Sequence, residues 1–198
     1  INPKPRDEDE NVQRHRARNE FAAQFVPRGG VVLDCASGSG DGRAILAAKA
    51  GRVIGVDKSR EAVDYALSNH ASPKIEYNCR PLETLGYEVG SLDSVVSLET
   101  LEHIPIEACL RFLMAAGCWI KPGGVLVASS PMLRYRDGKP YVTSPYHVNE
   151  MPRDELLPMF RDALPGYQIY CYHQRQDTFL PLLDEAEGFM VVVARRKV

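Results

Sequence analysis

The residues with the clearest chemical potential are two glutamates and two histidines. Glu99, Glu102 and His103 lie within five positions directly after an apolar stretch, and His147 lies in a later polar segment. If Glu99 begins a helical turn, the side chains at i+3 and i+4 share its face. Two carboxylates and two imidazoles can hold a divalent metal, and Mg²⁺, Mn²⁺, Fe²⁺ and Co²⁺ are all compatible with such donors.

The same four residues also fit two other interpretations. Without a metal, His103 or His147 can act as a general base while Glu99 or Glu102 orients the imidazole. In a purely structural role, Glu102 and His103 cap a helix and His147 hydrogen-bonds its own loop. A metal or a base here would activate a hydroxyl, which holds its proton to high pH and is otherwise a poor nucleophile.

A second feature is a glycine-rich turn between two apolar stretches that carry aspartates at their ends. The stretch Val31–Cys35 contains Asp34 and leads to Gly38 and Gly40, and the next apolar stretch ends at Asp57. This pattern is typical of a pocket for a nucleoside-bearing cofactor, with Asp57 on the ribose hydroxyls. An acid before the turn favours a cationic ligand, because a pyrophosphate needs unopposed backbone amides. Alternatively, the glycines serve only the backbone conformation of a tight turn and bind no ligand.

Apolar periodicity predicts the elements that must position these residues. Strands and helices alternate from residue 31 onward, which predicts a parallel sheet wrapped by helices, because parallel strands need crossover connections. Ligands of such sheets bind at the carboxyl ends of the strands. The expected strands are 31–35, 52–56, 74–78, 94–98, 125–129, 167–172 and 189–194, and the expected helices are 11–26, 43–49, 59–69, 106–119 and 154–160.

Composition narrows the class of protein. The 198 residues, 44% hydrophobic and 25% charged, suit one soluble α/β domain. The net charge of −2 argues against a broad nucleic-acid surface. No apolar run approaches the roughly 20 residues of a membrane span, and residues 1–20 are too polar for a signal peptide. Five cysteines without a CxxC pair favour reduced thiols in a cytoplasmic protein, and residues 1–10 are typical of a disordered segment.

With these motifs in order, most of the chain resembles the class I S-adenosylmethionine-dependent methyltransferases. Four segments carry the likeness: 34–40, 56–57, 94–103 and 120–126. Within the class, the chain is similar to a group of small bacterial or phage enzymes associated with glycosyltransferases, on residues 18–22, 129–131 and 144–150. Two places depart from the family pattern. Ala36 replaces the usual first glycine, and residues 79–82 replace a Gly-Asp-Ala sequence that would bind the adenine.

The resemblance implies a Rossmann-like α/β fold with a seven-stranded, mostly parallel sheet, an antiparallel last strand and helices on both faces. It implies S-adenosylmethionine as cofactor, whose ammonium and sulfonium charges match Asp34. The cofactor-binding residues that it implies are Asp34, Ala36, Gly38, Gly40, Asp57, Lys58, Pro81, Leu82, Ser97 and Leu98.

The glutamate and histidine spacing also resembles the metal pattern of small-RNA 3′-terminal 2′-O-methyltransferases and of some ubiquinone-pathway O-methyltransferases. That likeness implies four metal ligands: Glu99, Glu102, His103 and His147. Catalysis is then expected from Glu102, His103 and His147, by way of a metal or of a histidine base.

These observations predict a single methyltransferase domain over residues 1–198, with the helix 11–26 over the cofactor site. The expected reaction is methyl transfer to a hydroxyl of a sugar, glycan or natural-product precursor, with the tyrosines and arginines of Pro131–Asn149 near the acceptor. An RNA 3′-terminal 2′-O-methyltransferase and a non-catalytic cofactor-binding module are the alternatives, and a dehydrogenase is a more distant one.

Overall fold

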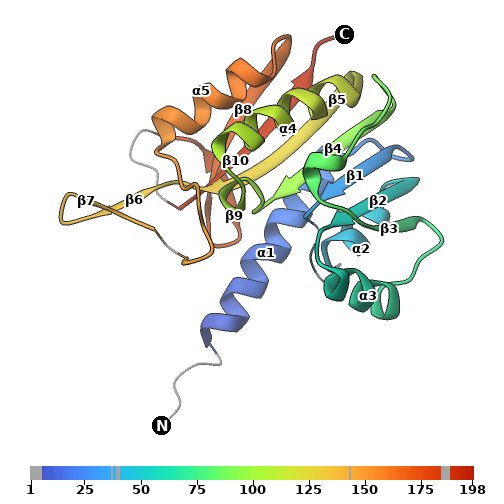
Figure 1. Ribbon diagram of the computed structural model, residues 1–198, viewed down its shortest axis with the longest axis horizontal. Coiled ribbons are helices and arrows are strands. Elements are labelled where there is room, and N and C mark those ends of the chain that lie inside the picture. The colour runs from blue at the N-terminus through green and yellow to red at the C-terminus, as the bar shows by residue number, and fades with distance from the viewer. Residues whose placement is uncertain (1–5, 37, 39–40, 143, 184–187) are drawn as a thin grey trace.

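Strand β1 (Val31–Cys35) lies inside the sheet between β2 and β4, and Val32, Leu33 and Cys35 are buried because helices cover both faces. The computed structural model describes residues 6–36, 38, 41–142, 144–183 and 188–198. Their main sheet has eight strands in the order β3-β2-β1-β4-β5-β10-β8-β9 (Figure 1). Strands β1 to β5 are parallel, so their carboxyl ends meet at one edge, as the alternating pattern predicts.

The expected count of seven strands with a single antiparallel one is wrong. Strand β10 is antiparallel to β5 and β8, and an additional strand, β9 (Thr178–Pro181), is antiparallel to β8. Strand β9 folds back through a tight turn in which Gln176 has a φ of 57°. A four-residue edge strand that ends in proline gives no alternating pattern long enough to recognise.

Most expected elements are present, with different ends. The helix Ile106–Trp119 has the predicted bounds. Ser59, the first residue of the predicted helix 59–69, is the N-cap of a helix that begins at Arg60, and its side chain accepts a hydrogen bond from the Ala62 amide at 3.2 Å. The first helix begins at Arg6, within the segment expected to be disordered, whereas residues 1–5 lie outside the described part. The remaining bounds are α1 Arg6–Phe25, α2 Asp41–Ala47, β2 Arg52–Asp57, α3 Arg60–Asn69, β3 Ile75–Cys79, η1 Leu82–Thr84, β4 Leu92–Leu98, η2 Leu101–His103, α4 Ile106–Trp119, β5 Ile120–Pro131, β6 Arg134–Arg136, β7 Lys139–Tyr141, α5 Arg153–Ala163, β8 Tyr167–Arg175 and β10 Phe189–Arg196.

Two apolar layers hold the helices on the sheet. Helices α4 and α5 pack on one face, around Leu113, Leu126 and Phe160. Helices α1 and α2 pack on the other, around Ala22, Leu46 and Val127 (Figure 1). Helix α1 therefore lies across the carboxyl edge of the sheet only in part, since its second half is anchored in this second core.

The polar segment Pro131–Asn149, called the polar excursion below, contains a short hairpin, β6–β7, that projects from the body of the protein (Figure 1). The excursion is closed at its base, where Met132 and Met151 are buried and bridged and the Leu133 amide donates to the Met151 carbonyl at 2.9 Å. Among the described residues, no helix combines the length and the apolar character that crossing a membrane requires.

Candidate functional site

A cavity of about 950 Å³ lies at the carboxyl edge of the sheet, between α1, the turn after β1 and the end of β4. The glycine turn and β4 supply the walls that the sequence predicted, and α1 supplies a third wall. Six of the predicted site residues line it: Asp34, Ala36, Gly38, Leu98, Glu99 and His103. Gly40 lies outside the described residues, so its expected place in the cavity remains a prediction.

The turn after β1 keeps the backbone geometry that glycine usually provides. Ala36 has a φ of 52°, in the left-handed region that L-residues with a side chain rarely adopt. Gly38 has the same φ, and its amide donates to Asp57 at 2.8 Å. The departure at Ala36 therefore preserves the turn at the expense of local strain.

Asp57 is positioned as an organiser of the turn. Its carboxylate accepts from the Gly38 and Ser59 amides, each at 2.8 Å, and its carbonyl accepts from the Arg80 amide at 2.9 Å. Five of the predicted cofactor-binding residues are not among the described residues that line the cavity: Asp57, Lys58, Pro81, Leu82 and Ser97. Their predicted roles in cofactor binding remain predictions.

Asp34 is 6% exposed and carries an unusual charge environment. Burial raises the pKa of its carboxyl to about 6, while the nearby Arg43 guanidinium opposes that rise. The Arg43 Nε lies 3.4 Å from Asp34 Oδ2. An acid that is ionised at neutral pH at the edge of the cavity can attract a cationic ligand.

Helix α1 is fastened to the site by a buried cation that sequence spacing does not reveal. Arg18 is 2% exposed, pairs with Glu99 and donates to Gln174 on β8 at 2.5 Å. His15 Nδ1 also lies 2.8 Å from the Glu99 carboxylate. Burial alone would raise the pKa of Glu99, but the His15 hydrogen bond and the Arg18 charge outweigh it and hold that pKa below its usual value.

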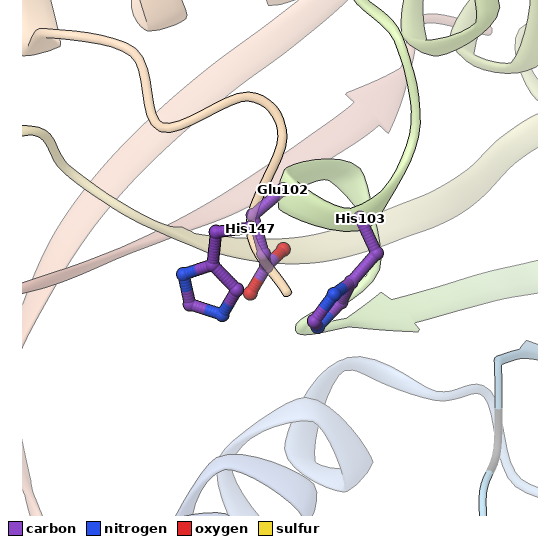
Figure 2. A group of neighbouring side chains, drawn as sticks. All are labelled: Glu102, His103 and His147. Atoms are coloured by element: carbon purple, nitrogen blue, oxygen red, sulfur yellow. The ribbon is translucent and has the colours of Figure 1, made fainter. Parts of the chain in front are cut away.

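Three of the four predicted metal ligands converge. Glu102, His103 and His147 each place one possible ligand atom within 4.8 Å of those of the other two. Figure 2 shows the first two arriving from the turn after β4 and the third from the loop that follows the β6–β7 hairpin. Glu99 faces α1 instead, so its predicted place among the ligands remains a prediction that its contacts with Arg18 and His15 do not favour.

Backbone and carboxylate partners orient both imidazoles. His103 Nδ1 lies 3.1 Å from the Tyr146 carbonyl, which can only accept, and His147 Nδ1 is hydrogen-bonded to Glu150. A neutral His103 ring therefore carries its proton on Nδ1 and its lone pair on Nε2, and an ionised Glu150 would select the same tautomer of His147. Metal-ligating histidines are commonly oriented by this arrangement.

Glu102 is the least ordinary member of the cluster. It is fully buried, and neither carboxylate oxygen has a hydrogen-bond partner among the described residues. Burial raises the pKa of its carboxyl to about 8, and the Glu99 charge adds to the rise. A buried carboxylate without a partner is costly to fold, and either a proton or a bound cation would lower that cost.

The cluster and the cavity share a residue, because His103 lines the cavity and also belongs to the cluster. The loop that carries His147 is held beside Glu102 by the Val148 and Asn149 amides, which donate to the Glu102 carbonyl at 2.8 and 3.1 Å. The arrangement can bring a cofactor in the cavity next to a group that activates an acceptor.

Comparisons with known proteins agree with this geometry. A family model described as a methyltransferase domain matches residues 32–124. A probable S-adenosylmethionine-dependent methyltransferase of Mycobacterium tuberculosis is 30% identical over 133 residues, which are 67% of this chain and 47% of that protein. The ubiquinone biosynthesis O-methyltransferase of Coxiella burnetii is 34% identical over 110 residues, which are 54% of this chain and 46% of that protein.

The fold is also found among solved structures. One chain in a complex between the Haloferax volcanii Trm112 methyltransferase activator and a methyltransferase aligns with a TM-score of 0.74 at 20% identity, covering 97% of this chain and 93% of that one. This likeness shows that the chain has the fold of that methyltransferase. Residues 32–124 match the methyltransferase-domain model, and the chain is similar to S-adenosylmethionine-dependent methyltransferases. It spans about half the length of the curated relatives it matches.

Sequence reasoning missed two groups of site residues. The α1 side chains that line the cavity include His15 and Asn19, and only the general position of this helix was expected. Arg43 was not expected in the site at all, because an arginine early in a helix after a glycine turn is most often solvated. No local spacing marks the contact of α1 with the site, since Arg18 and Glu99 are 81 positions apart.

Proposed function

We propose that the protein is an S-adenosylmethionine-dependent O-methyltransferase that acts on a hydroxyl of a sugar, glycan or natural-product precursor. The observation that carries this proposal is the Glu102, His103 and His147 cluster beside the cofactor cavity. A hydroxyl needs such activation, whereas a more nucleophilic acceptor would not. The similarity to an O-methyltransferase of Coxiella burnetii supports the choice of oxygen.

Each group of residues has a distinct task in the proposed reaction. Asp34, Ala36 and Gly38 would hold the amino-acid portion of the cofactor, which supplies the methyl group from its sulfonium. His103 would present a lone pair on Nε2 that can accept the acceptor proton or bind a metal, and His147 would serve as its partner in the cluster. Much of the acceleration would come from holding oxygen, carbon and sulfur in line.

The cluster fits a divalent metal. The fully buried Glu102 has two carboxylate oxygens without a hydrogen-bond partner among the described residues, and a cation would satisfy them. One carboxylate with two imidazoles favours Mn²⁺, Fe²⁺ or Co²⁺ over Mg²⁺, which prefers oxygen ligands. When bound, such an ion would lower the pKa of an acceptor hydroxyl and orient it.

The hairpin and the loop after it are placed to contact the acceptor. Tyr135, Tyr141 and Tyr146 are 59%, 41% and 77% exposed, and the Arg136 guanidinium lies 4.5 Å from the centre of the Tyr141 ring. Exposed aromatic rings stack on sugars, and arginines bind acidic groups. Tyr146 directly precedes His147, which supports an acceptor on this loop being held beside the cluster.

The finer assignments belong to this proposal as well. The free cysteines among the described residues support a reducing, cytoplasmic location, and the likeness to glycosyltransferase-associated enzymes supports a glycan acceptor.

The proposal is tested by metal analysis and by methyl transfer to a panel of hydroxyl acceptors. The protein is stripped with a chelator and reloaded with Mn²⁺ or Co²⁺, and metal content and S-adenosylhomocysteine formation are both measured. We expect metal retention and turnover in the wild type and loss of both in His147→Gln. His70→Gln, at the end of α3, is the matched histidine control and should retain both.

The alternatives give different results in the same assay. Full activity without metal would leave a histidine base as the mechanism. Turnover confined to an RNA oligonucleotide with a free 3′ end would favour the RNA 2′-O-methyltransferase, and cofactor binding without turnover on any acceptor would favour a binding module.

A further inference from the structure

The inference starts from Arg43, a fully buried arginine on α2. Its side chain is 0% exposed, and none of its three guanidinium nitrogens has a hydrogen-bond partner among the described residues. Asp34 Oδ2, at 3.4 Å from Nε, provides an ion pair rather than a well-formed hydrogen bond. A buried cation with so little compensation is costly, so its charge requires an explanation.

The surrounding residues form a chamber that fits the guanidinium. The guanidinium carbon, Arg43 Cζ, lies 4.5 Å from the centre of the Tyr77 ring on β3, which is a favourable cation–π contact. The absence of a side chain at Gly55 on β2 makes space for the guanidinium, because a Cβ added there would lie 2.2 Å from Arg43 Nε. The site is therefore shaped around an arginine side chain.

Arg43 stands behind Asp34 as seen from the cofactor cavity. Asp34 lines the cavity, whereas Arg43 is buried and is not among the described lining residues. The pair thus has a cavity side that carries the anion and a buried side that carries the cation. The other titratable or charged groups around this end of the cavity are Cys35, Asp57, His15, Arg16, Glu99 and His103.

We propose that Arg43 is a positioning residue that keeps Asp34 ionised and aimed at the cofactor, so that affinity for the cationic cofactor depends on a buried charge that never touches it. The inference rests on the proposed role of Asp34 in binding S-adenosylmethionine. Without Arg43, burial and the Asp57 charge would both favour the protonated Asp34, and a neutral carboxyl would lose its attraction for the ammonium and sulfonium.

The test is the pH dependence of cofactor affinity in Arg43→Met, measured by titration calorimetry with S-adenosylmethionine. A neighbouring cation typically lowers a carboxyl pKa by about 1 to 3. We therefore expect R43M to bind about tenfold more weakly than wild type near pH 7 and within about twofold of it near pH 9. The ratio of the two proteins is compared at each pH, so titration of the cofactor itself cancels.

Two sets of variants and the wild-type pH profile make the result decisive. Arg43→Lys retains a cation and should restore most of the affinity near pH 7. In an Asp34→Asn background, R43M should have no pH-dependent effect, because the group on which it acts is gone. The wild type alone should bind more weakly as the pH falls through the Asp34 pKa of about 6, which needs no Arg43 variant to fold.

Each unfavourable outcome points to a different error. A loss of affinity in R43M that is equal at every pH would show that Arg43 only supports the fold, and would overturn the inference. A wild-type affinity that is flat across roughly pH 5 to pH 8 would also overturn it. No cofactor binding by the wild type at any pH would instead refute the proposed function itself.

Discussion

Arg18→Met tests whether a single buried ion pair fastens helix α1 over the cofactor cavity. Arg18 is 2% exposed and its partner Glu99 has an 18% exposed side chain, so the pair is largely shielded from water. Removing one partner of a buried pair destabilises by about 3–5 kcal/mol, because the other charge stays buried. His15 remains 2.8 Å from Glu99, so we expect the low end, about 3 kcal/mol.

The assay is urea unfolding of the metal-free protein, run as a double-mutant cycle with Glu99→Gln. If the two side chains interact directly, the double variant is more stable than the sum of the single changes predicts, by about 1–2 kcal/mol. Cofactor affinity of Arg18→Met should fall as well, because α1 forms one wall of the cavity.

The matched control is Arg16→Met, on the same helix. Arg16 pairs with Glu20 at 2.8 Å, but its side chain is 73% exposed, so the change should be within about 0.5 kcal/mol. Additivity of R18M and E99Q within about 0.5 kcal/mol would refute the direct pair and with it the fastening of α1 to the site.

Three further changes address other parts of the molecule. Glu102→Gln should abolish stoichiometric Co²⁺ binding, monitored by the visible absorption of the ion, while thermal unfolding shows a folded protein. Ala36→Gly, which relieves a φ of 52°, should leave unfolding free energy unchanged or raise it by up to about 1 kcal/mol; a larger loss would show that the methyl group is needed. Asp93→Asn should reduce acid sensitivity. Burial would raise the Asp93 pKa, but the Val31 amide and Lys121 hold it below its usual value, so this stability is present above about pH 4 and is lost at lower pH. Because the Lys121 side chain is 42% exposed, the difference from wild type in acid denaturation should be only about 1 kcal/mol.

The sequence alone predicts a strand or a helix correctly where the local hydrophobic pattern determines it. The apolar run at Leu33 and the spacing within Ile106–Trp119 identify a buried strand and a helix, because hydrophobic periodicity reports which face is covered. Glu102 and His103 lie on one turn, but that turn begins at Leu101 and Glu99 has a φ of 52°, so the face that the spacing predicted for all three residues does not form. His147 was reached only by assuming that its loop returns to the same edge.

Contacts between distant segments lay beyond local pattern. Glu99 has the same residue type and local position whether it turns toward a metal or toward Arg18, and only the packing of α1 decides between them. The burial of Arg43 on α2 also depends on a distant segment, because its side chain occupies the space left by Gly55 on β2. Strand β9 is too short for its periodicity to be distinguished from a loop.

The closed base of the polar excursion gives the protein an exchangeable module. Met132 and Met151 fix where this segment leaves and rejoins the core, and the Glu102 carbonyl holds its last turn. The hairpin between these points can therefore change in length and composition without disturbing the sheet. If the proposed acceptor role of the hairpin is right, substituting another hairpin of this kind should change acceptor choice in a methyl-transfer assay and leave S-adenosylmethionine affinity unchanged.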